Sequence, residues 1–165
     1  MPSVDLATHT GTIDECCQNG VMARVTARAS RQVGAPVERV REFLRDYREA
    51  RPQILTDNYS AYRVEAGGDG AGTVVAYHFA AGRRERDYRL RVEESGGSLR
   101  ERDELSSFVS TWTVAAAGAG STVTLESSWE GAGGVAGVFE GFFAPLGLRR
   151  IYGEMLSRLA AALGG

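Results

Sequence analysis

Histidine is the side chain best suited to proton transfer near neutral pH, and the body of this chain contains only His78. His78 stands between Tyr77 and Phe79. Alternate residues of a strand point to opposite faces, so His78 faces solvent if its aromatic neighbours face the interior. The position therefore argues against a catalytic histidine, and the sequence assigns no catalytic residue.

Two carboxylates, Glu101 and Asp103, are spaced so that both fall on one face of a strand, as acid-base chemistry would require. Their neighbours Arg100, Arg102 and Glu104 are charged as well. A run of mixed charges is typical of a solvated strand, and we expect that arrangement here.

A glycine-rich stretch at residues 131–136 (GAGGVA) fits the pattern G-x-G-x-x-A between an expected strand and an expected helix. A dinucleotide site also needs a parallel strand after that helix, and the chain ends in helix instead. We therefore expect a flexible entry to the last helix rather than a nucleotide site.

The charge balance disfavours a nucleic-acid partner. The chain carries 19 basic and 21 acidic residues, a formal net charge of -2. The densest basic cluster, residues 83–91, contains Glu85 and Asp87 and is followed by further acidic residues. These largely cancel its charge, so we expect a solvated hairpin rather than a surface for RNA or anionic lipid.

The two cysteines, Cys16 and Cys17, are adjacent, and adjacent cysteines rarely bridge each other. No histidine-rich or cysteine-rich ligand set accompanies them, so we expect no metal and no cofactor. The first residues show neither a signal-peptide pattern nor strand or helix periodicity, and no apolar stretch is long enough to span a membrane. These features predict a cytoplasmic protein with a loose arm at 1–21 and a single domain at 22–165.

The length of 165 residues, 43% of them hydrophobic, suffices for one core without disulfides. An approximate period of two predicts a strand at 23–33. Pro36 and the apolar spacing after it predict a helix, and residues 48–54, with Pro52, predict a second short helical turn. Six further strands, at 59–65, 73–81, 84–94, 98–103, 106–115 and 121–130, are separated by glycine-rich turns.

One face of these strands is predicted to be rich in aromatic residues. Residues 135–163 return to helical spacing, and Pro145 predicts a kink or break before a longer helix that begins near Leu148. We expect these elements to form an antiparallel meander followed by a C-terminal helix, an α+β fold.

This order of elements resembles the helix-grip fold. Residues 33–40 (VGAPVERV), 120–125 (GSTVTL), 148–150 (LRR) and 155–159 (MLSRL) resemble the polyketide cyclase/dehydrase-like branch of the SRPBCC, or START-like, superfamily. The resemblance covers nearly all of the chain after Met22. It implies a sheet of about seven strands wrapped around the long C-terminal helix, two short helices after the first strand, and an internal cavity for lipids, polyketides or other apolar molecules.

The side chains expected at that cavity are mainly aromatic and apolar, with a few polar groups. Arg51 or a tyrosine is expected to anchor a polar group of the ligand, and Glu154 is a further polar candidate. The same residues would also serve to fill the core of any domain of this size. The candidate ligand-binding residues are Arg51, Tyr59, Tyr77, Phe79, Tyr88, Leu90, Trp112, Trp129, Phe139, Phe142, Phe143, Ile151, Tyr152 and Met155.

Three functions remain open at this point. The first is non-covalent binding of a small hydrophobic molecule by a carrier or sensor, acting as a monomer or homodimer. The second is a polyketide cyclase or dehydratase that works without metal by holding a reactive chain in a folded pose. The third is a protein-interaction or toxin-like module that uses an exposed sheet edge.

Overall fold

A computed structural model describes residues 24–131 and 134–164, with the backbone alone at 134–144. The expected arm at 1–21 therefore lies outside the described residues. The glycine-rich stretch at 131–136 lies partly outside them.

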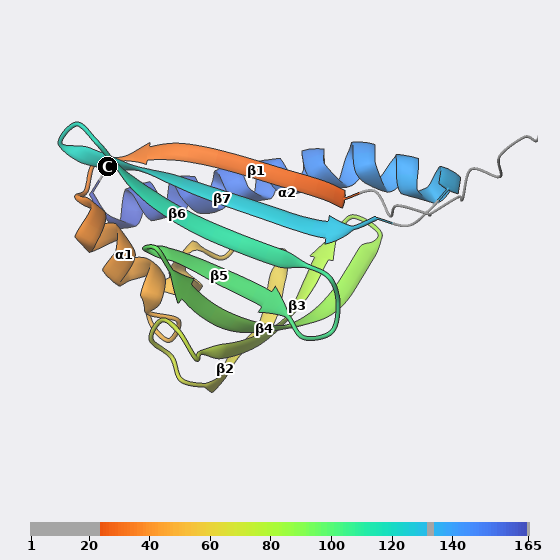
Figure 1. Cartoon of the computed structure of the whole chain (residues 1–165), viewed down its shortest axis with the longest axis horizontal. Coiled ribbons are helices and arrows are strands. Elements are labelled where there is room, and N and C mark those ends of the chain that lie inside the picture. Colours follow the sequence, from red (N-terminus) through yellow and green to blue (C-terminus); the bar gives the residue numbers. More distant parts are fainter. Residues whose placement is uncertain (1–23, 132–133, 165) are drawn as a thin grey trace, which may run out of the picture.

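Seven antiparallel strands form one curved sheet in the order β1-β7-β6-β5-β4-β3-β2 (Figure 1). Consecutive strands from β2 to β7 pair as hairpins, and β1 joins the far edge beside β7. The strands are β1 (Arg24–Val33), β2 (Tyr59–Ala66), β3 (Val74–Ala81), β4 (Arg84–Ser95), β5 (Ser98–Asp103), β6 (Val109–Ala117) and β7 (Gly120–Glu130). The expected meander is thus confirmed.

The helices occupy the concave side and one end of this sheet. The helix α1 (Val37–Arg45) and the 3-10 turn η1 (Arg51–Ile54) follow β1, and the long helix α2 (Gly134–Ala162) runs along β1 (Figure 1). The predicted second helical turn is therefore a single turn of 3-10 helix. The core lies between α2 and the sheet, where Val123, Leu156 and Leu159 are completely buried.

Two expectations about element boundaries are wrong. The sixth strand begins at Val109 instead of 106, because the preceding residues form a turn in which the Ser106 hydroxyl donates to Asp103. The last helix begins at Gly134 instead of near Leu148, and of the two outcomes expected at Pro145, a kink or a break, the break does not occur. Proline removes one main-chain donor, but its fixed φ near -65° is compatible with a helix.

No helix in the described parts of the chain is long and apolar enough to cross a membrane.

Candidate functional site

A capped turn carries Arg51 into the interior. The Asp46 carboxylate accepts hydrogen bonds from the backbone N–H groups of the next residues, at 3.0 Å from Arg48, 3.0 Å from Glu49 and 3.2 Å from Ala50. These bonds hold the pKa of Asp46 below its usual value, and the bond from Glu49 has the largest effect. Because Arg51 follows directly in η1, the cap fixes the direction from which its side chain enters the core.

The partner of Arg51 comes from the inner face of the sheet. In β5, Leu99, Glu101 and Asp103 are buried and alternate with exposed arginines. Glu101 pairs across the sheet with Ser110, and Leu99 pairs with Trp112. Strand register therefore brings the carboxylate, a hydroxyl and an indole to the same patch of the interior.

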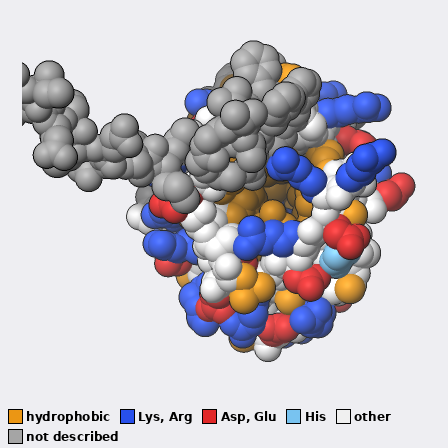
Figure 2. Space-filling model, turned by 90° about the vertical axis from the view of Figure 1, so that its right-hand side faces the viewer, with side chains coloured by type: hydrophobic (Ala, Val, Ile, Leu, Met, Phe, Trp, Pro, Cys, Tyr) orange, Lys and Arg blue, Asp and Glu red, His pale blue; other side chains and the backbone are white. Residues whose placement is uncertain are grey.

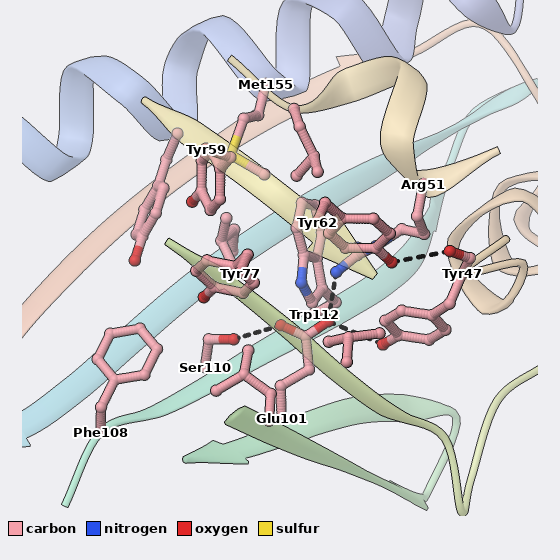
Figure 3. Close-up of a pocket in the computed structure, with 15 residues that line it drawn as sticks. Tyr47, Arg51, Tyr59, Tyr62, Tyr77, Glu101, Phe108, Ser110, Trp112 and Met155 are labelled. Carbon is pink, nitrogen blue, oxygen red and sulfur yellow. Dashed lines mark hydrogen bonds and ion pairs between the residues drawn. The ribbon is translucent and has the colours of Figure 1, made fainter. Parts of the chain in front are cut away.

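We call Arg51, Glu101, Tyr47, Ser110 and the adjacent Trp112 the buried ion-pair cluster (Figure 3). Glu101 Oε1 accepts a hydrogen bond from the Arg51 guanidinium and a second one, 2.8 Å long, from the Tyr47 hydroxyl. Glu101 Oε2 accepts a hydrogen bond from the Ser110 hydroxyl at 2.6 Å. The Arg51 and Glu101 side chains are each 6% exposed. Both carboxylate oxygens are therefore satisfied by donors from three different parts of the fold.

Aromatic rings enclose the guanidinium as well. The Arg51 Cζ atom lies 4.2 Å from the ring centroid of Trp112 and 5.0 Å from that of Tyr47. Both distances are within the range of cation–π attraction. Burial is the largest single influence and opposes the charge of Arg51, but Glu101 and the neighbouring tyrosines together outweigh it, so the pKa of Arg51 is raised. The pKa of Tyr47 is raised well above its usual value, mainly by burial and secondly by the negative charge of Glu101.

Two buried donors at this cluster have no hydrogen-bond partner among the described residues. They are Arg51 Nη1 and Trp112 Nε1. A buried unsatisfied donor costs about 1–3 kcal/mol, so such groups in a folded protein call for a partner. Both residues line an internal cavity, and Figure 3 shows the guanidinium and the indole side by side.

This inner cavity is small, about 40 Å³. That volume holds only a few water molecules. Burial raises the pKa of Tyr59, Tyr77 and Tyr152 above the usual value, so these rings present neutral hydroxyls. The lining residues are Tyr47, Arg51, Leu55, Tyr59, Tyr62, Val75, Tyr77, Leu90, Glu101, Phe108, Ser110, Trp112, Leu125, Tyr152 and Met155.

A continuous series of contacts between aromatic rings leads away from the inner cavity, from Tyr59 to Trp129. Tyr59 and Tyr77 have ring centroids 5.1 Å apart, Tyr77 stacks on Tyr88 at 5.4 Å, and Tyr88 meets Phe108 edge-on at 5.1 Å. Phe108 then lies 6.3 Å from Trp129. These rings separate the inner cavity from a larger space outside.

That space, which we call the outer hollow, measures about 1050 Å³. Hydrophobic side chains lie at its bottom, and charged side chains lie along the described part of its rim (Figure 2). Its walls come from the β3–β4 hairpin, the turn before β6, the end of β7 and α2. The lining residues are Phe79, Ala81, Gly82, Arg83, Arg84, Glu85, Arg86, Tyr88, Ser106, Ser107, Phe108, Trp129, Glu130, Gly147 and Leu148.

The structure divides the sequence-predicted site residues between these two spaces. Those at the inner cavity are Arg51, Tyr59, Tyr77, Leu90, Trp112, Tyr152 and Met155. Phe79, Tyr88 and Trp129 line the outer hollow. Ile151 is buried in the core and lines neither space. The side chains of Phe139, Phe142 and Phe143 lie outside the described residues.

The structure also places other residues that the sequence singled out. His78 faces outward, as expected, and its Nδ1 lies 2.8 Å from Asp87 Oδ1. The 83–87 part of the basic hairpin is exposed, as expected. Glu154 is exposed and pairs with Arg158 at 2.7 Å, so it does not reach the interior.

The expectation of a solvated face for Glu101 and Asp103 is wrong, because both side chains are buried. The alternation with Leu99, an apolar residue on the same face of the strand, was the one sequence signal that pointed to their burial. Tyr47, Tyr62 and Ser110 were also missed as cavity residues. Ser110 has no distinguishing pattern in the sequence, since only its pairing with Glu101 gives it a role.

A curved antiparallel sheet that grips a long helix around an aromatic cavity defines the SRPBCC class of proteins. The model of the family described as "Polyketide cyclase / dehydrase and lipid transport" matches residues 24–164, and this chain belongs to that family. The expected resemblance is thus confirmed. No curated protein sequence matches the chain.

Several solved structures are similar. The KanY protein is 45% identical, with a TM-score of 0.79, over 87% of this chain and 100% of KanY. The Zhui aromatase/cyclase from Streptomyces sp. R1128 is 13% identical, with a TM-score of 0.68, over 86% of this chain and 94% of that one. Major latex-like protein 151 from Panax ginseng is 12% identical, with a TM-score of 0.66, over 86% and 99%. The last two share the fold.

Proposed function

We propose that this protein binds a small, mainly apolar molecule between the curved sheet and α2 and holds it without covalent chemistry, as a carrier or a sensor. The observation that carries the proposal is the outer hollow of about 1050 Å³ with an aromatic floor. Small-molecule sites have volumes of about 300–1,000 Å³ and are lined mainly by apolar and aromatic side chains. Membership of a family described by cyclisation and lipid transport supports the same proposal.

The body of the ligand lies in the outer hollow rather than deep in the core. The inner cavity, at about 40 Å³, is largely filled by the protein's own side chains. The outer hollow is about 1050 Å³ and has Phe79, Phe108, Trp129 and Leu148 in its walls. Burying apolar ligand surface against these side chains contributes about 25 cal/mol per Å² before the costs of association.

The test uses N-phenyl-1-naphthylamine, a neutral aromatic probe whose fluorescence rises in apolar surroundings. We expect saturable binding of one molecule per chain. We also expect the probe to stabilise the folded state by about 2.7 kcal/mol at one hundred times its dissociation constant. Fluorescence titration and thermal unfolding measure the two effects.

Two variants at neighbouring positions test whether the probe binds in the outer hollow. Ala81→Trp adds a large side chain to the wall of the hollow and is expected to weaken binding by about tenfold or more. Ala80→Trp adds the same side chain one residue earlier, on the opposite face of β3, and is expected to leave binding unchanged. Absence of probe binding to the unsubstituted protein, or equal effects of the two substitutions, would contradict the proposal.

A second candidate function, a cyclase or dehydratase, is favoured by the buried ion-pair cluster. Its unpartnered N–H groups are of the kind that polarise a carbonyl group. The two functions differ in what happens to a bound diketone such as 1-(2-naphthyl)hexane-1,5-dione, whose terminal methyl carbon can attack the aryl ketone to close a six-membered ring with loss of one water molecule. Mass spectrometry of the recovered compound is expected to show it unchanged for a carrier and lighter by one water molecule for an enzyme.

A further inference from the structure

The buried ion-pair cluster has spare hydrogen-bond donors but no spare charge. Glu101 already accepts from Arg51, Tyr47 and Ser110, so both carboxylate oxygens are occupied. Arg51 Nη1 and Trp112 Nε1 are the two buried donors of the described cavity lining that have no partner. Arginine and the indole N–H can only donate, so the group that satisfies them must be an acceptor.

We propose that this end of the inner cavity is a subsite for a neutral hydrogen-bond acceptor, a carbonyl or ether oxygen at one end of an otherwise apolar ligand. The inference rests on the proposed binding function and adds the chemical class of the ligand. Trp112 is 2% exposed and the Arg51 side chain 6% exposed, so both donors act where water competes least.

Charge decides between a neutral acceptor and a carboxylate. Among the described residues that line the inner cavity, Arg51 and Glu101 alone are charged, and their charges cancel. A second carboxylate would be desolvated beside Glu101, and this described lining offers it no further cation. A carbonyl oxygen accepts the same two hydrogen bonds without adding a buried charge.

Size limits which part of the ligand reaches the subsite. About 40 Å³ admits a compact group, whereas the outer hollow of about 1050 Å³ admits a ring system. Phe108 lines both spaces, so the ligand passes this ring when its polar end enters and its body stays outside. An aromatic ketone has this shape.

The experiment compares three probes of nearly equal size by displacement of N-phenyl-1-naphthylamine. They are 2-acetylnaphthalene, the hydrocarbon 2-isopropenylnaphthalene, in which a methylene replaces the ketone oxygen, and 2-naphthoate. We expect the ketone to bind about tenfold more tightly than the hydrocarbon, since it satisfies donors that the hydrocarbon leaves unpaired. The naphthoate is expected to bind more weakly than the ketone at neutral pH.

The indole N–H signals in the NMR spectrum give a second readout. The chain has two tryptophans, so Trp129→Phe assigns the signal of Trp112. The ketone is expected to shift the Trp112 signal, as a new hydrogen bond does, and the hydrocarbon to leave it nearly in place. Trp129 lines the outer hollow, so Trp129→Phe is also the control that keeps the preference for the ketone.

Two variants test the donor and the charge separately. Trp112→Phe removes one donor and keeps an aromatic ring, and it is expected to reduce the ketone advantage severalfold while the hydrocarbon binds within about twofold of its original affinity. Glu101→Gln leaves the charge of Arg51 uncompensated and is expected to strengthen naphthoate binding by about tenfold.

The outcomes separate this inference from the proposed function. Equal affinities for ketone and hydrocarbon, with an unmoved Trp112 signal, overturn the subsite and leave the binding function standing. Tighter binding of naphthoate than of the ketone by the unsubstituted protein overturns the neutral character of the subsite. Failure of every probe to bind contradicts the proposed function, and the subsite falls with it.

Discussion

At the scale of single residues, burial gives Arg51 and Glu101 their importance. The pair joins η1 to β5 across 50 residues of sequence, and each side chain is 6% exposed. Removing one partner from such a pair leaves a buried charge without compensation. The same arginine at the surface would contribute little, because exposed ion pairs are weakened by solvent and salt.

Replacing Glu101 tests this difference. We expect Glu101→Ala to lower the free energy of unfolding by about 3–5 kcal/mol, measured by urea denaturation. The matched control is Glu42→Ala, which breaks the exposed pair with Arg39 and is expected to cost less than about 1 kcal/mol. Equal costs for the two variants would show that the buried pair does not stabilise the fold.

His78 permits a second test at this scale, on the outer face of β3. Its hydrogen bond to Asp87 raises the pKa of His78 above the ordinary 6.5. The charged form is therefore favoured in the folded state, so the stabilisation is present below pH 6.5 and is lost as pH rises through the folded pKa. NMR titration is expected to show this raised pKa.

The control for this titration lies in the same hairpin. Asp87→Asn is expected to return the pKa of His78 towards 6.5, because the hydrogen bond to Asp87 is the largest cause of the shift. Glu85, whose carboxylate lies 3.7 Å from Nε2, contributes less, so Glu85→Gln is expected to have a smaller effect. A larger effect of Glu85→Gln would reverse this assignment.

At the scale of elements, Gly120 allows the end of the edge strand β1 to lie close to the start of β7. A Cβ atom at Gly120 would lie 2.4 Å from the carbonyl oxygen of Val33, which is closer than real Cβ contacts. The contact is to backbone, so no side chain can move aside. Only glycine fits where β7 begins beside the end of β1.

Gly120→Ala is therefore expected to destabilise the protein by about 1–3 kcal/mol through overpacking. Gly153 is a suitable control because it lies in α2 with open space at its Cβ position. Gly153→Ala is expected to stabilise the protein by about 0.5–1 kcal/mol through helix propensity. Chemical denaturation distinguishes the two signs, and a neutral Gly120→Ala would contradict the close approach.

At the scale of the whole molecule, all six tyrosines have raised pKa values, with burial as the largest cause in each. For Tyr62 the raised pKa is about 12. The unfolded chain ionises near pH 10, whereas the folded protein keeps its tyrosine protons. Above that pH the folded state therefore binds more protons than the unfolded state, and the free energy of unfolding falls as pH rises.

We expect the folded protein to show little phenolate absorbance near pH 10 and to lose stability steeply at higher pH. Phenolate absorbance of the folded protein and of the protein in urea, followed over the same pH range, measures the difference. Urea denaturation at several pH values measures the accompanying loss of stability. Tyrosine ionisation near pH 10 in the folded protein would contradict the burial of these rings.

The sequence by itself determined the order of the elements. Periods of two and of three to four residues fix which side chains share a face, and glycine-rich turns mark the ends of strands. The antiparallel meander, the C-terminal helix and the outward direction of His78 followed from these local rules, whereas the curvature of the sheet was implied by the family resemblance. The helix start expected near Leu148 was wrong, since α2 begins at Gly134 and continues through Pro145. Proline weakens a helix without excluding helical angles.

Only the tertiary structure decided that Glu101 is buried and how the interior divides. The period of β5 places Leu99, Glu101 and Asp103 on one face, but a carboxylate stays inside only if a distant cation compensates it. Arg51 supplies that charge from a turn 50 residues away. The volumes of about 40 Å³ and about 1050 Å³ likewise depend on how side chains from separate elements fill the space between them, which no local pattern encodes.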